Sequence, residues 1–85
     1  MKIYWTKKSA QDLEFFRKNN QKIVERIKLL IDDIKINPYQ GLGKPEPLKY
    51  NLTGCWSRRI TGSNRLVYRV NLEGDVEILQ CRYHY

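Results

Sequence analysis

The sequence predicts an α+β fold over residues 1–85, in which two N-terminal helices pack on an antiparallel-rich sheet of four or five strands. Two observations predict this class. Apolar residues recur at helical spacing in the first half of the chain, and runs rich in β-branched and aromatic residues follow in the second half. A chain of 85 residues with a hydrophobic fraction of 41% is enough for one domain with one modest core.

The first two elements are a short strand and a helix. Residues 2–5, KIYW, are rich in apolar side chains and predict the strand. Ser9 and Asp12 form a Ser-x-x-Asp pattern that resembles a capping box and predicts the beginning of the first helix. Apolar side chains at helical spacing continue this helix as far as the asparagine pair at residues 19–20.

The second predicted helix carries the clearest pattern in the chain. Its apolar residues form one stripe over residues 23–34, and charged residues lie off the stripe. Pro38 ends the helix, because the residue before a proline resists helical geometry.

A long irregular segment and three strands follow. Residues 37–54 contain all three prolines and three of the five glycines, and so long a loop in a small domain is often functional. Strands are expected at residues 55–61, 65–71 and 76–82, with turns at GSN and LEGD between them.

Alternation along the first hairpin predicts which side chains face the helices. The inward set is Trp56, Ile60, Leu66, Tyr68 and Val70. Pairing Ile60 with Leu66 predicts a three-residue loop, and Arg59 and Arg65 then share the opposite face. Arg58 falls on the apolar face, where it must escape at an edge or find a partner.

Positive charge is concentrated in one part of the chain. The formal net charge is +7, from 16 basic and nine acidic residues. Residues 44–69 hold six basic residues against one acid, Glu46, which is a local charge of +5. Such a surplus attracts polyanions such as RNA, DNA or an acidic protein. An ordinary solvated basic surface is the alternative, although these cations cluster in or beside expected strands.

Several functional classes are not supported by the sequence. No apolar run is long enough to span a membrane, and the first residues lack the apolar stretch of a signal peptide, so a cytoplasmic location is expected. Cys55 and Cys81 do not form a metal-binding spacing, and one histidine cannot complete a common zinc site. We therefore expect two reduced packing cysteines and no metal or other cofactor.

Two residues stand out as candidates for proton transfer. Glu46 lies between Pro45 and Pro47, which restrict its backbone. His84 is the only histidine, and the preceding strand carries it to a sheet end that the 37–54 segment could reach. A surface glutamate with incidental salt bridges and an ordinary tail histidine are the alternative interpretations.

Together, Glu46, the cation cluster and His84 suit the cleavage of RNA by its own 2′-hydroxyl. This reaction needs a base for the 2′-OH proton, cations for the charge that builds on the phosphorane, and an acid for the departing 5′-oxygen. It requires no metal, and DNA lacks the hydroxyl. Tyr83 and Tyr85 add flat rings on which an unpaired base can stack.

Four short segments in a fixed order resemble one protein family. They are GKPEPL, WSRRI, RLVY and the final CRYHY. Their order is similar to the pattern of YoeB toxins, members of the RelE superfamily, and the resemblance runs from Trp5 to the last residue. The chain departs from the pattern at Tyr50, where a histidine is usual, at Cys55, where an aromatic residue is common, and in the acidic turn LEGD. None of these is an expected catalytic residue.

The resemblance implies a RelE-like fold and the toxin of a type II toxin–antitoxin pair. It implies a ribosome-dependent endoribonuclease that cuts mRNA in the A site and inhibits translation. The implied partners are the ribosome, mRNA, an acidic YefM-like cognate antitoxin and a second copy of the chain in a homodimer. A non-catalytic RelE-fold inhibitor or nucleic-acid-binding protein is the alternative, and a ribosome-independent ribonuclease is a third interpretation.

Matching positions in the resemblance imply roles for individual residues. Glu46 is the expected base, His84 the expected acid, and Arg65 the residue expected to stabilise the transition state. RNA-binding, phosphate-binding or site-shaping roles are expected for Lys44, Lys49, Arg58, Arg59, Tyr83 and Tyr85.

Overall fold

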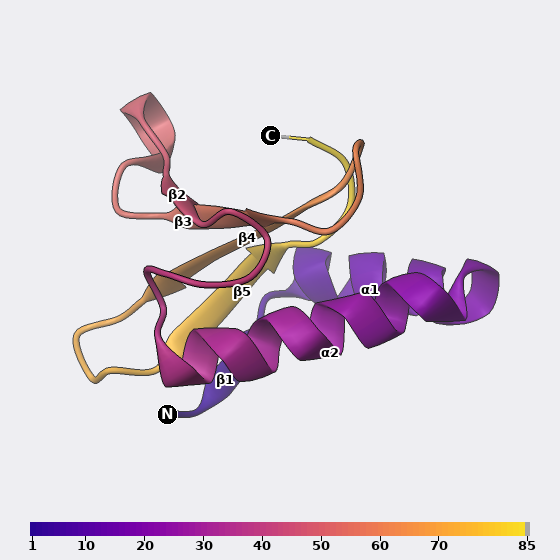
Figure 1. Cartoon of the computed structure of the whole chain (residues 1–85), viewed down its shortest axis with the longest axis horizontal. Helices are drawn as coiled ribbons and strands as arrows, with labels where there is room; N and C mark the ends of the chain where they lie inside the picture. The colour runs from indigo at the N-terminus through magenta and orange to yellow at the C-terminus, as the bar shows by residue number, and fades with distance from the viewer. Residues whose placement is uncertain (85) are drawn as a thin grey trace.

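The computed structural model describes residues 1–84, and Tyr85 lies outside the described residues. Within that range, two α-helices, one 3₁₀ helix and five strands follow one another along the chain (Figure 1). They are β1 (Ile3–Trp5), α1 (Lys7–Asn19), α2 (Gln21–Ile36), β2 (Glu46–Pro47), the 3₁₀ helix η1 (Tyr50–Leu52), β3 (Trp56–Arg59), β4 (Arg65–Val70) and β5 (Val76–Gln80).

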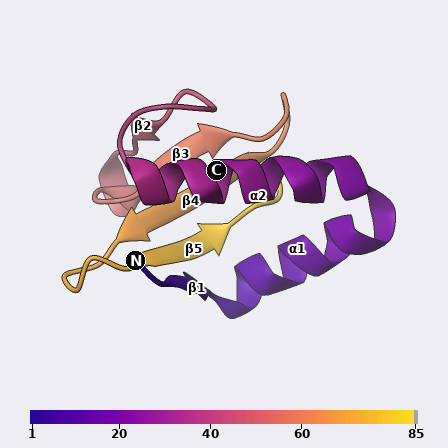
Figure 2. The same cartoon turned by 60° about the horizontal axis from the view of Figure 1, so that its bottom comes forward.

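The strands form one mixed sheet in the order β1-β5-β4-β3-β2. β1 runs parallel to β5, and the other neighbouring strands are antiparallel. Both α-helices lie against the same face of this sheet (Figures 1 and 2). The predicted α+β class is therefore confirmed. No helix within residues 1–84 combines the length and the apolar character needed to cross a membrane.

Helix α1 begins earlier than the sequence pattern predicted. Its N-cap is Thr6, whose side-chain oxygen accepts a hydrogen bond from the Ser9 amide at 3.1 Å. Ser9 and Asp12 are instead buried: the Ser9 hydroxyl donates to the Ile78 carbonyl of β5 at 2.7 Å, and the Asp12 carboxylate accepts from the amide of Cys81, the residue after β5, at 3.1 Å. The predicted capping box is therefore wrong, because tertiary contacts use these polar groups to attach the helix to the sheet.

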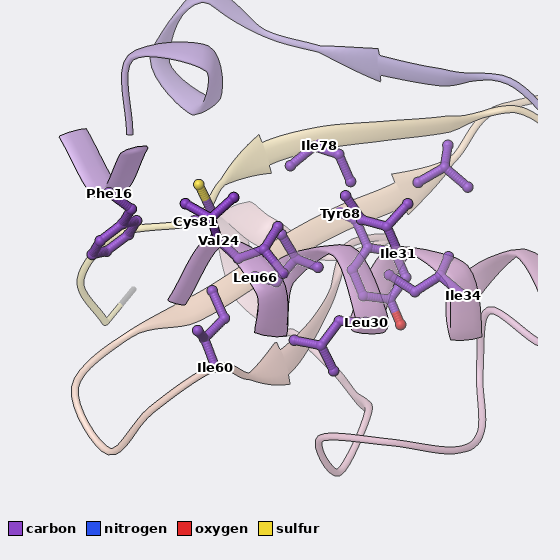
Figure 3. Packing of buried hydrophobic residues seen from close by; sticks show 12 residues of the cluster. Phe16, Val24, Leu30, Ile31, Ile34, Ile60, Leu66, Tyr68, Ile78 and Cys81 are labelled. Atoms are coloured by element: carbon purple, nitrogen blue, oxygen red, sulfur yellow. The ribbon is translucent and has the colours of Figure 1, made fainter. Parts of the chain in front are cut away.

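Helix α2 supplies most of the helical side of the core. Asn20 caps its beginning and Asn37 its end. The helix therefore ends before Pro38, as the sequence predicted. Its apolar stripe packs on β4 and β5, and Figure 3 shows Ile31 and Ile34 beside Tyr68. The main buried cluster consists of Phe16, Val24, Ile27, Leu30, Ile31, Ile34, Ile60, Leu66, Tyr68, Val76, Ile78 and Cys81.

The hairpin register differs from the predicted register by two residues. Leu66 pairs with Arg58 rather than with Ile60, and Arg65 pairs with Arg59. The loop is consequently longer, and the amides of Ile60 and Thr61 both donate to the Asn64 carbonyl. A shift of two residues preserves which face each side chain occupies. The predicted inward side chains all pack in or against the main core.

A second, smaller cluster lies on the opposite face of the sheet. Leu48, Cys55 and Val67 are buried there, with Leu52 and Leu79 packed against them. Val67 reaches this face because its strand neighbours Leu66 and Tyr68 point to the helices. The cluster secures the segment that connects β2 to β3 on the face that carries the candidate site. Cys55 and Cys81 are both buried and unpaired, as expected.

Candidate active site

A small cavity brings the predicted base together with three of the predicted cations, Lys44, Arg59 and Arg65. Glu46, Arg59 and Arg65 line it, and its volume is about 70 Å³. Gly43, Lys44 and Ser57 complete the lining. The structure therefore joins residues that are up to 22 positions apart in the sequence, from Gly43 to Arg65.

Strand pairing explains how these side chains meet. Glu46 pairs with Ser57 across β2 and β3, and Arg59 pairs with Arg65 across β3 and β4. Ser57 and Arg59 are two positions apart on one strand, so they share a face. That face points away from the helices, because Arg58 between them points into the protein interior. The cavity therefore opens on the side of the sheet that α1 and α2 leave uncovered.

The two arginines lie directly opposite one another on neighbouring strands. Like charges directly opposite one another on neighbouring strands destabilise a sheet, and an anion between Arg59 and Arg65 would relieve that repulsion. The Arg65 guanidinium is held in place, because its Nη1 donates to the Thr61 carbonyl at 2.7 Å and to the Asn64 carbonyl at 3.2 Å. The Arg59 side chain is more exposed. One cation is therefore positioned by the hairpin loop and the other faces solvent.

The C-terminal segment runs beside the beginning of β4. The Arg65 amide donates to the Tyr83 carbonyl at 3.0 Å, and the Tyr83 amide donates to the Asn64 side-chain oxygen at 2.8 Å. Figure 1 shows the chain after β5 turning back over the face of the sheet opposite the helices. His84 follows Tyr83 directly and is exposed. The predicted acid is thus carried to the side of Arg65 that is opposite Arg59.

The backbone of Tyr83 has a positive φ, which few residues other than glycine adopt. Its φ is 69°, in the left-handed region, and 57% of its surface is exposed. The Arg82 guanidinium lies over two aromatic rings, 3.4 Å from the Phe15 ring centre and 4.5 Å from the Tyr83 ring centre. This stacking links the C-terminal segment to α1. The role predicted for Tyr85 lies outside the described residues.

Arg58 does not face the cavity, which corrects one of the predicted phosphate contacts. Its side chain is 0% exposed. The guanidinium donates to the Asp33 carboxylate, to the Tyr68 hydroxyl and to three backbone carbonyls of the segment before β2. Arg58 is therefore on the apolar face, as predicted, and Asp33 is the partner that compensates its buried charge. Direct contact with RNA is incompatible with this burial, and only a site-shaping role remains.

The other predicted cations occupy different places around Glu46. Lys44 lines the cavity with a φ of 52°. Lys49 lines a second, larger hollow of about 390 Å³, formed by residues 46–52. Arg69 is on the outer face of β4 but pairs with Glu77 on β5, which compensates its charge. The basic segment is therefore not one uniform patch, and Glu46 lies where the cavity and the larger hollow meet.

A comparison of the whole chain with known proteins decides the family. The family model for the YoeB-like toxin of bacterial type II toxin–antitoxin systems matches residues 5–85. The chain belongs to this family. It is 49% identical to Toxin YoeB of Synechocystis sp., over 100% of this chain and 98% of that protein. It is 47% identical to Toxin YoeB of Escherichia coli K12, over the full length of both chains.

Solved structures agree with this assignment. The YoeB/ParE toxin from Agrobacterium tumefaciens superposes with a TM-score of 0.96 at 49% identity, over all of both chains. The toxin chain of a YoeB–YefM complex from Staphylococcus aureus gives a TM-score of 0.91 at 42% identity, over 100% of this chain and 98% of that chain. YafQ from E. coli, at 17% identity and a TM-score of 0.79, shares the fold.

Sequence reasoning missed two residues of this YoeB-family site. Ser57 lines the cavity opposite Glu46, and its signal was its spacing of two positions from Arg59 on the same strand. Asn64 holds the Tyr83 amide, but its position within a turn suggested only a turn residue. The second contact could not be read from local pattern, because the partners are 19 positions apart.

Two further features of residues 1–84 concern possible metal ligands and the buried thiol of Cys81. No group of three or more His, Cys, Asp or Glu side chains in that range is arranged to hold a metal ion. Burial raises the pKa of the Cys81 thiol to about 12, and the nearby Asp12 carboxylate adds to the effect. The thiolate is therefore not available as a nucleophile near neutral pH.

Proposed function

We propose that this YoeB-family toxin is an endoribonuclease that cleaves mRNA in the ribosomal A site and thereby inhibits translation. The observation that carries the proposal is the shared cavity of Glu46, Arg59 and Arg65, with His84 next to the residue that is bonded to the Arg65 backbone. The cavity supplies a carboxylate and two guanidinium groups, and His84 follows the residue whose carbonyl accepts from the Arg65 amide. Membership of the toxin family supports the same activity.

The chemistry follows from the roles of these groups. Glu46 removes the proton from a 2′-hydroxyl, and the freed 2′-oxygen attacks the adjacent phosphorus. Arg65 stabilises the extra negative charge on the phosphorane, and Arg59 contacts the phosphate and holds the RNA in place. His84 protonates the departing 5′-oxygen as its bond to phosphorus breaks. The products are a 2′,3′-cyclic phosphate and a free 5′-hydroxyl.

Dependence on the ribosome is consistent with the size of the site. A cavity of about 70 Å³ accommodates a phosphate group rather than a whole nucleotide. Precise placement of the reacting groups accounts for a large part of catalysis in general, so a small open site benefits from a second surface that fixes the RNA. The ribosomal A site would supply that surface. A toxin that acts on ribosomes would act in the cytoplasm.

An acidic, YefM-like antitoxin is the proposed inhibitor. Structures of S. aureus relatives are described as YoeB–YefM complexes and as a YoeB dimer. The net charge of +7 and the cation pair on the open face favour a partner with carboxylate side chains. Such a partner would cover the region between Glu46 and His84. A homodimer of this chain is proposed on the same comparison.

Glu46→Gln tests the proposed activity. Wild type and variant are incubated with mRNA, with and without ribosomes, and the cut sites are mapped. We expect cleavage by wild type only on ribosomes, and a loss of about 10²- to 10⁴-fold in the variant. Ribosome binding should persist, because the cations remain. Glu73→Gln, in the exposed turn before β5, is the matched control and should cleave like wild type.

Other outcomes would support the alternatives. Cleavage by Glu46→Gln at the wild-type rate would exclude Glu46 as the base. Cleavage of free mRNA at the same sites would favour a ribosome-independent ribonuclease. Ribosome binding by wild type without any cleavage would favour the non-catalytic inhibitor.

A further inference from the structure

A fully buried arginine organises the segment that leads to Glu46. The Arg58 side chain is 0% exposed. Its Nε donates to the Tyr68 hydroxyl at 3.1 Å and its Nη1 to the Asp33 carboxylate at 2.5 Å. The remaining hydrogen bonds reach backbone carbonyls at 2.7 Å (Asn37), 3.0 Å (Gln40) and 3.1 Å (Leu42).

All three carbonyls belong to residues 37–42, between α2 and β2. Two partners of Arg58 bind the same segment. The Tyr68 hydroxyl donates to the Pro38 carbonyl at 2.6 Å, and the Asp33 carboxylate accepts from the Leu42 amide at 2.9 Å. Side chains from α2, β3 and β4 therefore hold a stretch of backbone that has no regular structure of its own.

The packing around this segment is too close for a side chain at Gly41. Its φ is +121°, and a Cβ there would lie 2.1 Å from an oxygen of Asp33. The carboxylate thus occupies the space that a side chain would need. The segment is docked through its backbone, in one conformation that requires glycine at this position.

The docked segment continues directly into one wall of the cavity. The Gly43 carbonyl accepts a hydrogen bond from the Arg59 amide at 2.7 Å. Gly43, Lys44 and Glu46 then line the cavity together with Arg59 and Arg65. Arg58 lies in the strand between Ser57 and Arg59, with its side chain on the opposite face of the sheet.

We propose that Arg58 is a positioning residue for the cleavage reaction. By holding residues 37–42, it sets where Glu46 and Lys44 lie relative to Arg59 and Arg65. A free segment of this length would sample many conformations, and a misplacement of about 1 Å can cost roughly 10²-fold in rate. This inference rests on the proposed nuclease activity and explains how that site is kept in register.

Arginine suits this position better than any other residue. Its planar guanidinium presents five N–H donors in a fixed arrangement and stays charged. Asp33 supplies the opposite charge, as a buried cation requires. Lysine at position 58 would offer three donors from one nitrogen and could not reach the same set of acceptors.

Conservative variants of its partners test the proposal, because Arg58→Ala would also open a large cavity. Tyr68→Phe removes only the hydroxyl that bridges Arg58 and Pro38. Asp33→Asn removes the charge that pairs with Arg58. Val24→Ala, in the core at the other end of α2, is the control for simple loss of stability.

Three quantities are compared at equal fraction folded. The first is amide hydrogen exchange at Leu42 and Arg59, whose N–H groups donate to the Asp33 carboxylate on α2 and to the Gly43 carbonyl. The second is the rate of mRNA cleavage at saturating toxin–ribosome complex, and the third is affinity for the ribosome. We expect both partner variants to exchange these amides faster and to cleave about 10- to 100-fold more slowly. Affinity should stay within about twofold, because the exposed cations are unchanged.

Two outcomes would overturn the inference. One is exchange at Leu42 and Arg59 that matches the Val24→Ala control. The other is faster exchange with an unchanged cleavage rate, which would leave Arg58 a purely stabilising residue. If wild type fails to cleave at all, the proposed nuclease activity fails, and the exchange data still decide whether Arg58 holds the cavity wall.

Discussion

Three consecutive side chains on β3 show how much one residue step changes the environment. Ser57 and Arg59 line the cavity on the open face of the sheet. Arg58 between them is buried and bonded to Asp33 and Tyr68. Strand alternation is the cause, since neighbours on a strand point to opposite faces. Two neighbouring arginines therefore have different environments: the Arg59 guanidinium is exposed beside the cavity, and the Arg58 guanidinium is buried and hydrogen-bonded inside the protein.

Arg65 and Arg59 should act on different steps of the reaction. The Arg65 guanidinium is positioned by the carbonyls of Thr61 and Asn64, so we expect it to stabilise the transition state. Arg65→Gln should lower the saturating cleavage rate about 10²- to 10³-fold with little effect on ribosome affinity. Arg59→Gln, the matched variant, should weaken affinity and reduce its salt dependence by about one counterion. Equal losses of rate and affinity in Arg65→Gln would reduce Arg65 to a docking residue.

The ion pair between Asp33 and Arg58 should make the stability of the fold depend on pH. Hydrogen bonds from the Leu42 amide and the Arg58 guanidinium hold the pKa of the Asp33 carboxyl below its usual range. Because the folded pKa is the lower one, this stabilisation is present above the unfolded pKa, about 3.9, and is lost as pH falls through the folded value. Asp33→Asn should therefore reduce the free energy of unfolding at pH 7, and the difference from wild type should shrink below about pH 4.

Urea unfolding at several pH values measures this difference. Asp32→Asn, at the exposed neighbouring position on α2, is the control and should show a much smaller change. A deficit in Asp33→Asn that stays constant down to pH 3 would contradict the charge-dependent role of Asp33.

At the scale of elements, polar contacts attach the parts of the fold that carry the site. α1 is bonded to β5 through Ser9 and Asp12, and the C-terminal segment is bonded to the beginning of β4 through Asn64 and Tyr83. These contacts join segments that are distant in the sequence. They place the apolar core on one face of the sheet and the candidate catalytic groups on the other.

Ser9→Ala should destabilise the fold without acting on the site. The Ser9 side chain is buried, and its hydroxyl satisfies the Ile78 carbonyl. The Ile78 carbonyl keeps the hydrogen bond from the Thr6 amide, so removing the hydroxyl should cost about 0.5–1.5 kcal/mol in the free energy of unfolding. Denaturant unfolding measures the loss, with the exposed Ser63→Ala as control. A loss equal to that of Ser63→Ala would show that the contact contributes nothing.

Asn64→Ala should loosen the segment that carries His84. It removes the acceptor of the Tyr83 amide and the side-chain contact with Thr61. We expect faster hydrogen exchange at Tyr83 and slower cleavage, because the acid is less well placed, with a small change in unfolding free energy. Asn19→Ala, at the exposed end of α1, provides the comparison. Unchanged exchange at Tyr83 would show that Asn64 does not hold the segment.

On the scale of the whole molecule, the two faces of the sheet are specialised. The helices lie against one face (Figure 1), where the main core is buried, and the cavity and the small second cluster lie on the other. The net charge of +7 attracts polyanions to the molecule in general. The uncovered face decides where an anionic partner can reach the cation pair, so RNA and an acidic antitoxin should compete for it.

An acidic YefM-like antitoxin should therefore protect one face. On its addition, we expect slower hydrogen exchange on β3 and β4 near Arg59 and Arg65, a higher unfolding temperature, and loss of ribosome binding. The affinity should fall with added salt. Glu46→Gln should still bind the antitoxin, which separates inhibition from catalysis. Protection confined to α1 and α2, with ribosome binding intact, would contradict competition on the open face.

The sequence by itself determined the features that depend on local pattern. Helix α2, the strands of the hairpin and their inward side chains follow from spacing along the chain, because periods of 3.6 and 2.0 are properties of neighbouring residues. The candidate residues Glu46, Arg65 and His84 were also named from sequence, from motif resemblance and the proline pair around Glu46. The predicted face of each hairpin side chain is correct although the predicted strand pairing is not, because a register shift of two residues leaves the alternation of faces unchanged.

Only the tertiary structure decided the register of the hairpin and the partners of the buried polar groups. The Arg58–Asp33 pair spans 25 positions, and the Ser9 and Asp12 contacts with β5 each span 69. No local pattern encodes such a contact, because its energy depends on which surfaces the rest of the chain brings together. The same limit explains why Arg58 resembled a phosphate ligand in the sequence. In the folded protein Arg58 is buried, and in our proposal it holds residues 37–42 and thereby positions Glu46 relative to Arg59 and Arg65.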